Sequence, residues 1–433
     1  MYTRGLIEFL NASPTAFHAI DEIAKMLDSA GFTCLKESEK WNLTPGGKYY
    51  VTRNLSSVIA FIAPKDGKIA LRIAASHSDS PVFKIKENAE IDVRGKYIQL
   101  NSERYGGMIF SSWLDKPLSV AGRVLLKTGK GLSTRLVNID KDMLVIPNVA
   151  IHMNRSVNDG FKYNPQTDLS PLFGDARAKG AFKRIIADSV QAEEKDILGS
   201  DLYLYSRVKP SVWGVNEEFI SAGRLDDLEC AYTGITALME ANVESGMPVA
   251  AVFDNEEVGS TTKQGADSTF LTDVIRRAVY ALGADEEAFM RAASASMMLS
   301  CDNAHAMHPN HPEFSDSTNW VIMNAGIVIK ESANQKYTSD GASKAVLRAI
   351  LNEKDIPYQF FANRSDMLGG GTLGNISNSH FSLNTVDIGL AQLSMHSSWE
   401  TAGAEDVRHM VNGVKAFFET PVSMDADGEF AIG

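Results

Sequence analysis

The feature that most constrains the fold is an alternation of short apolar runs with amphipathic helices in the second half of the chain. The runs PVAAVF, SMMLS, YQFFA and VDIGLAQL are separated by segments such as FLTDVIRRAVYAL and SKAVLRAILNEK, in which apolar residues recur every three or four positions. Strands and helices that alternate in this way build a mainly parallel sheet with helices on its faces. We therefore predict an α/β fold with a mixed, largely parallel sheet flanked by helices.

The N-terminal part has the same character, but a segment of different texture follows it. SPTAFHAIDEIAKMLDSAG predicts a helix, and YYVTR, VIAFIA and KIALRIAAS predict strands. Residues 87–214 contain stretches of period two and a long polar passage, which predict a smaller β-rich domain. After it, LDDLECAYTGITALMEAN predicts a helix. The expected organisation is a discontinuous main domain, residues 1–86 and 215–433, with an inserted domain over residues 87–214.

Composition excludes several classes of partner. The formal net charge is −12, from 42 Lys+Arg and 54 Asp+Glu, whereas nucleic acids and anionic membranes bind basic surfaces, so we expect neither as a partner. No apolar run approaches the roughly 20 residues that a bilayer demands. The three cysteines have no paired spacing, which indicates free thiols in a reducing compartment, and we expect a cytoplasmic protein.

Polar clusters with histidine and carboxylate side chains follow several of the apolar runs. In open α/β sheets, function gathers at the carboxyl ends of the strands, so these clusters are expected to share one crevice. Carboxylates crowded there repel each other and lose hydration, a need that two divalent cations meet. Imidazole with carboxylate suits zinc, with cobalt or manganese as alternatives. The side chains concerned are His77, Asp79, Asp226, Asp227, Glu256, Glu257, Asp302, His305 and His396.

Each cluster also has an ordinary structural explanation. A lone His-x-Asp is most often a surface or capping pair, a Glu-Glu pair is usually a solvated face, and Asp226-Asp227 read locally is a helix N-cap. The run GGGTLG matches the glycine pattern of a dinucleotide site, but the segment after it is too short and polar for the helix that such a site requires. A tight turn or a substrate-facing loop is the better interpretation of these glycines.

Several motifs together resemble the aspartyl aminopeptidase family of dinuclear zinc metallopeptidases. The matching stretches are SHSDSP, GRLDDL, FDNEEVGS, CDNAHAMHPN and QLSMHS, with IPNVAIHMNR inside the insert. The resemblance extends from Ser13 to His396. It implies a metal-dependent aminopeptidase that acts on peptides and removes single, acidic residues from their N-termini. It also implies a homo-oligomer, a dodecamer with enclosed active sites.

The resemblance further implies two metal ions in each subunit. One ion is held by His77, Asp226 and Asp302, and the other by Asp226, Glu257 and His396. Asp226 therefore bridges the two ions, which fits the two oxygens of a carboxylate and the separation of about 3.5–4 Å in two-metal sites.

Two catalytic residues follow from the same resemblance. Asp79 is the carboxylate that orients His77 and raises its basicity. Glu256 is the general base, which accepts a proton from the attacking water and delivers it to the leaving amine.

Four further residues are implied in substrate binding. Lys330 supplies a cation for an acidic side chain, Tyr337 and His305 are placed near the substrate, and His152 reaches the active site of a neighbouring subunit. The alternatives are a Lys330 that caps a strand into solvent and a His152 in a core or interface. The stretch around Lys330 departs from the commoner family sequence, which leaves open a general two-metal aminopeptidase or amidohydrolase with non-acidic substrates. A separate alternative is a non-catalytic oligomeric scaffold.

Overall fold

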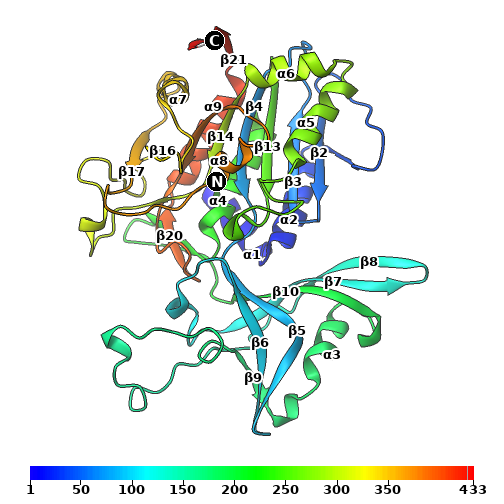
Figure 1. Cartoon of the computed structure of the whole chain (residues 1–433), viewed down its shortest axis with the longest axis vertical. Helices are drawn as coiled ribbons and strands as arrows, with labels where there is room; N and C mark the ends of the chain where they lie inside the picture. The colour runs from blue at the N-terminus through cyan, green and yellow to red at the C-terminus, as the bar shows by residue number, and fades with distance from the viewer. Residues whose placement is uncertain (427) are drawn as a thin grey trace.

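The main body of the protein is a nine-stranded sheet (Figure 1), seen in a computed structural model that describes residues 1–426 and 428–433. In sheet order the strands are β1 (Thr33–Leu35), β2 (Lys48–Arg53), β3 (Ser57–Ile62), β13 (Met247–Phe253), β4 (Leu71–His77), β14 (Met297–Cys301), β18 (Asn384–Gly389), β16 (Ile327–Glu331) and β17 (Tyr358–Ala362). The pairs β1–β2, β13–β4, β4–β14, β14–β18 and β16–β17 are parallel, and the pairs β2–β3, β3–β13 and β18–β16 are antiparallel. The predicted mixed, largely parallel sheet is confirmed.

Two helical layers cover this sheet. Successive strand residues face opposite sides, and apolar residues on both sides need to be covered. In β3, Val58 and Ala60 belong to one core cluster, and Ile59 and Phe61 belong to the other. The first cluster is closed by α1 (Tyr2–Ala12), α2 (Ala16–Ser29), α4 (Leu225–Glu240), α7 (Gly341–Glu353) and α9 (Asp406–Glu419). The second is closed by α5 (Phe270–Ala281), α6 (Glu286–Ser294) and α8 (Leu373–Ser377).

A separate six-stranded sheet occupies the lower part of Figure 1. Its order is β8 (Gly131–Asn138), β7 (Leu118–Thr128), β10 (Ile197–Ser206), β5 (Val82–Val93), β6 (Tyr97–Tyr105) and β9 (Leu172–Asp175), and α3 (Ala181–Ser189) packs with it. This sheet has its own hydrophobic cluster. We propose that the inserted domain spans residues 82–206, slightly earlier than the 87–214 expected from the sequence pattern. It ends there because the next strand, at residues 211–213, belongs to a different sheet.

That next strand opens a five-stranded sheet beside the main one. The order is β11 (Ser211–Trp213), β12 (Phe219–Ala222), β20 (Glu400–Gly403), β19 (Ala391–Leu393) and β15 (Ala304–His305). A hairpin of β21 (Val422–Ala426) and β22 (Glu429–Ile432) ends the chain. Among the described residues, none of the helices combines the length and the apolar character needed to cross a bilayer.

Candidate metal centre

Adjacent central strands of the main sheet deliver the predicted ligands to one edge. His77 is the last residue of β4, Glu256 and Glu257 lie in a short helical turn just after β13, and Asp302 directly follows β14. Because β13, β4 and β14 are neighbours, their carboxyl ends bring these side chains together. His396 joins them from the loop after β19.

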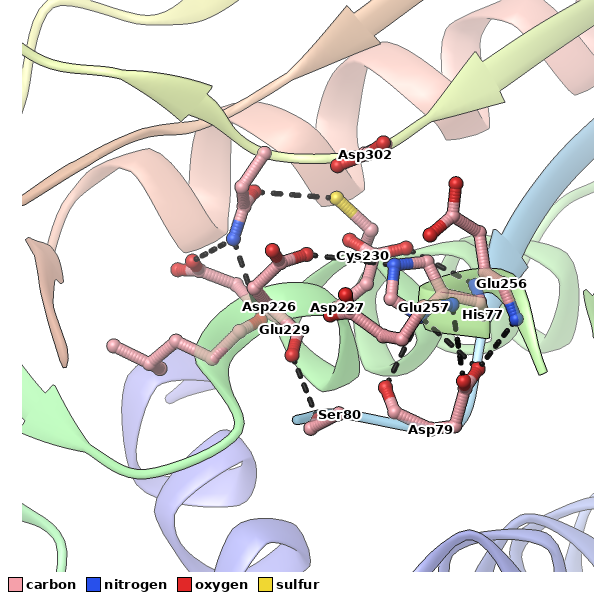
Figure 2. A network of polar contacts seen from close by, with 12 residues as sticks. His77, Asp79, Ser80, Asp226, Asp227, Glu229, Cys230, Glu256, Glu257 and Asp302 are labelled. Atoms are coloured by element: carbon pink, nitrogen blue, oxygen red, sulfur yellow. Dashed lines mark hydrogen bonds and ion pairs between the residues drawn. The ribbon is translucent and has the colours of Figure 1, made fainter. Parts of the chain in front are cut away.

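The acidic pair at the start of α4 turns inward and does not cap the helix. Asp226 and Asp227 have non-helical backbone angles and are joined by a cis peptide bond, and Arg224 occupies the N-cap position without a side-chain capping bond. The N-cap interpretation of this pair is therefore wrong. Both carboxyl groups are buried beside His77 (Figure 2), whose backbone N–H donates to Asp227 Oδ2 at 3.1 Å.

Asp226 is shared by two groups of potential ligands. In each group, one ligand atom from every residue lies within 4.8 Å of the others; the groups are His77, Asp226, Asp227 and Asp302, and Asp226, Glu257 and His396. Asp226 Oδ1 lies 3.4 Å from His77 Nε2, and its Oδ2 lies 3.3 Å from His396 Nε2. His396 Nε2 also lies 3.4 Å from Glu257 Oε1. The two oxygens of one carboxylate thus face two different imidazoles.

The unpaired oxygens in this cluster test whether a metal fits. Asp226 Oδ1, Asp227 Oδ1 and Glu257 Oε1 are buried and accept no hydrogen bond from the part of the chain that the structure describes. A buried polar atom left in this state costs about 1–3 kcal/mol, and more when it is charged. Divalent cations offset that cost, and carboxylates with imidazoles are a ligand set that zinc accepts. The residues present therefore fit zinc.

The titration behaviour of the cluster leads to the same conclusion. Burial raises the pKa of Glu257 well above its usual value, and the neighbouring Asp226 adds to the effect. Burial also raises the pKa of Asp302 to about 6. For His77, burial alone would lower the pKa, but Asp227 and Asp226 outweigh it and the pKa is raised. The protein side chains therefore favour added positive charge, as a cation site must.

Asp79 connects one imidazole to the acidic turn. Its backbone carbonyl lies 3.0 Å from His77 Nδ1, which directs Nε2 towards the ligand cluster. Its carboxylate accepts the backbone N–H groups of Glu256 at 3.1 Å and of Glu257 at 3.2 Å. The carboxylate Oδ1 lies 3.4 Å from His77 Nδ1, so an orienting role of the carboxylate itself stays a prediction, and its hydrogen bonds hold the turn after β13.

Glu256 lies beside the ligand groups without belonging to either of them. Burial raises the pKa of its carboxyl to about 7, with His77 acting in the opposite direction and Asp302 in the same one. A carboxylate in this pKa range accepts and returns a proton near neutral pH. The position and the pKa support the predicted general base.

Glu400 is a residue of the centre that sequence reasoning missed. It is 1% exposed, and its carboxylate accepts the backbone N–H of His396 at 2.7 Å and that of Asp226 at 3.1 Å. Burial raises its pKa to about 8, and Asp226 contributes to the rise. A glutamate four residues after a ligand carries no local signal, because its partners are set by tertiary structure.

Two predicted substrate residues are buried behind the ligands. Lys330 is 2% exposed, and its Nζ donates to the carbonyl oxygens of Asp302 at 2.7 Å and of Asn303 at 3.4 Å. The alternative that Lys330 caps a strand into solvent is therefore wrong. Tyr337 is also buried, with its ring centroid 5.1 Å from Lys330 Nζ.

The other two predicted substrate residues are exposed. His305 ends β15 with its ring edge-on to Phe361. His152 lies in an exposed turn between β8 and β9. Within the described chain, no hydrogen bond or ion pair connects His152 to the metal ligands, so the structure does not bring it into its own subunit's centre.

The sheet gathers carboxylates and imidazoles at the edge where α/β enzymes place their sites, and divalent ions held by such side chains activate water for hydrolysis. The family model of the aminopeptidase I zinc metalloproteases (M18) matches residues 9–418. The chain belongs to this family and is a zinc metallo-aminopeptidase.

Similar proteins cover nearly the whole chain. A probable M18 family aminopeptidase 2 of Clostridium novyi (strain NT) is 45% identical over 426 residues, covering 96% of this chain and 98% of that protein. A protein of the same description from Pseudomonas paraeruginosa is 39% identical, covering 96% of this chain and 97% of its own. A chain in the cryo-EM structure of the Ape4 and Nbr1 complex is similar, with a TM-score of 0.93 and 34% identity, covering 96% of this chain and 85% of that chain. The S. cerevisiae mApe1 dodecamer gives a TM-score of 0.83 and 26% identity over 96% of each chain.

Proposed function

We propose that this aminopeptidase holds two divalent cations in each subunit, zinc in the first instance, and releases acidic residues from peptide N-termini. The observation that carries the two-ion part is the shared position of Asp226, whose two oxygens face His77 and His396. A single ion would satisfy only one of the two ligand groups.

The chain's own residues would divide the chemical work. Bound zinc supplies Lewis acidity for a water molecule and for the peptide carbonyl. Glu256 takes the proton of the attacking water and passes it to the leaving amine, a contribution of about 10²–10⁴-fold in rate. Asp79 holds the backbone of Glu256, so the base stays at a fixed distance from the ligands.

Two adjacent substitutions test this division. Glu256→Gln is expected to lower kcat by about 10²–10⁴-fold with zinc content unchanged, because the base is lost and no ligand is. Glu257→Gln is expected to lower the zinc content, because it removes a ligand next to His396. Metal analysis and release of N-terminal residues from peptides measure both. Near-normal turnover by Glu256→Gln, or full zinc retention by Glu257→Gln, would contradict the assignment.

The acidic preference depends on a cation near the substrate. Lys330 Nζ, 4.0 Å from Asp302 Oδ2, is the positive charge that supports it, together with the resemblance to aspartyl aminopeptidases. One observation favours the alternative of a general aminopeptidase: Lys330 Nζ already donates to two backbone carbonyls. Acid-specific and general activity are separated by the substrate panel described below.

We further propose a homo-oligomer, a dodecamer, in which His152 serves a neighbouring site. The mApe1 relative is a dodecamer, and the apolar side chains of Val149, Ile151 and Met153 beside His152 are 55%, 49% and 82% exposed. Exposed apolar side chains gathered on one segment are typical of protein interfaces. His152→Ala should then lower turnover while the sedimentation of the assembly is unchanged. A cytoplasmic location is part of the proposal, and the three free cysteines support it.

A further inference from the structure

Residues 105–109 belong to the inserted domain, yet they contact the metal centre. The segment starts at the last residue of β6, where the Tyr105 hydroxyl donates to Asp79 Oδ2 at 2.6 Å and accepts from Asn255 Nδ2 at 2.7 Å. The same Asp79 carboxylate holds the backbone of Glu256 and Glu257. The Tyr105 hydroxyl therefore holds Asp79 in place. The carboxylate of Asp79 orients the turn with Glu256 and Glu257, and the backbone carbonyl of Asp79 contacts His77.

The same segment contacts the ligands of the second group. The backbone carbonyl of His396 accepts the N–H of Ile109 at 3.0 Å, and a Cβ built at Gly107 would lie 4.0 Å from His396 Nδ1. Gly106 has a φ of +73°, and a Cβ built there would lie 3.1 Å from the Cβ of Glu257. Close packing against this ligand and a left-handed backbone both favour glycine at this position.

We infer that residues 105–109 position the ligands of both metal sites, so that the inserted domain is part of the metal centre in addition to any role in assembly. The inference rests on the proposed two-metal function. Partners that orient ligands typically change metal affinity by about 10–100-fold when they are removed. Tyr105 acts through Asp79, and Gly106 acts through Glu257, so both are positioning residues and neither is a ligand.

Two matched pairs of variants separate positioning from general packing. Tyr105→Phe removes the hydroxyl that holds Asp79. The control is Tyr203→Phe, because the Tyr203 ring centroid lies 6.1 Å from that of Tyr105 and its hydroxyl has no hydrogen bond within the described chain. Gly106→Ala adds a methyl group against Glu257. Gly95→Ala imposes similar backbone strain in the same domain, at a φ of +65°, with no atom within 4 Å.

The readouts are zinc affinity of the metal-depleted chain, measured by chelator competition, and the visible spectrum of the cobalt-loaded chain. Tyr105→Phe and Gly106→Ala are expected to bind zinc about 10–100-fold more weakly than Tyr203→Phe and Gly95→Ala, and to change the cobalt spectrum. If Gly106→Ala does not fold, the nearly isosteric Tyr105→Phe decides. Equal zinc affinities within both pairs would overturn the inference and leave the two-metal function intact. A wild-type chain that binds fewer than two ions would instead refute the proposed function.

Discussion

Replacing Glu400 with glutamine tests whether a residue outside both groups of potential ligands sets zinc affinity. Its carboxylate accepts one N–H from the backbone of Asp226 and one from that of His396, so it connects the residue shared by both groups of potential ligands to a member of the second group. Glu400→Gln keeps the volume but has only one acceptor oxygen. The amide nitrogen then faces an N–H donor, and one of the two ligand backbones loses its partner.

The expected size of the effect follows from these two bonds. A hydrogen bond to a charged group contributes about 1.5–3 kcal/mol, and the variant loses at least one such bond. If this loss falls on the metal-loaded state, zinc affinity drops about 10- to 100-fold. Burial raises the pKa of Glu400 to about 8, so the comparison is best made near about pH 9, where the wild-type side chain is ionised with or without zinc.

The matched control is Asp406→Asn. Asp406 is also a fully buried carboxylate that accepts two backbone N–H groups, from Asn324 at 2.5 Å and Gly326 at 2.9 Å, but it belongs to neither ligand group. Both variants are expected to lower the free energy of unfolding, and only Glu400→Gln should weaken zinc binding in chelator competition. Equal zinc affinities for the two variants would refute the reasoning.

Two further predictions concern stability and specificity. His18 is buried with its Nδ1 2.8 Å from Thr15 Oγ1, and burial lowers its pKa from 6.5 to about 4. The unfolded chain therefore binds a proton that the folded chain does not, so the stability from neutral His18 is complete above pH 6.5 and is lost as the pH falls towards 4, by about 3 kcal/mol. Urea unfolding of His18→Gln should show a shallower loss over this range, and an unchanged slope would contradict the assignment. Lys330→Met should impair release of N-terminal Asp and Glu more than of Leu or Ala; equal losses would assign Lys330 to the support of Asp302 and favour the general aminopeptidase.

Sequence patterns located the strands of the centre because those strands are buried on both faces. KIALRIAAS, PVAAVF and SMMLS correspond to β4, β13 and β14, and a polar cluster follows each of them. Helix α9 was not predicted from the pattern. Its central Gly413 has a poor helix propensity, but a Cβ there would overlap Ile327, so packing decides the residue.

The supporting residues of the centre could not be predicted in the same way. Asp227 was visible as half of an acidic pair, but its inward direction depends on a non-helical backbone at the start of α4. Tyr105 and Glu400 contact the centre from other parts of the chain, and no spacing in the sequence relates them to Asp79 or Asp226. The predicted ligands could be found from the sequence because most of them follow strands whose carboxyl ends converge. The residues that hydrogen-bond to those ligands could not, because their positions depend on how the loops pack in the folded protein.

The place of β13 in the main sheet has a consequence for synthesis of the chain. This strand lies between β3 and β4, although it is made about 170 residues after β4, once the whole inserted domain has left the ribosome. At 5–20 residues per second the delay is roughly 10–30 s. During that time the edges of β3 and β4 that β13 will cover are unpaired, and unpaired strand edges of this kind recruit foreign strands. The nascent enzyme is thus exposed to aggregation through β3 and β4 in the interval before β13 is made.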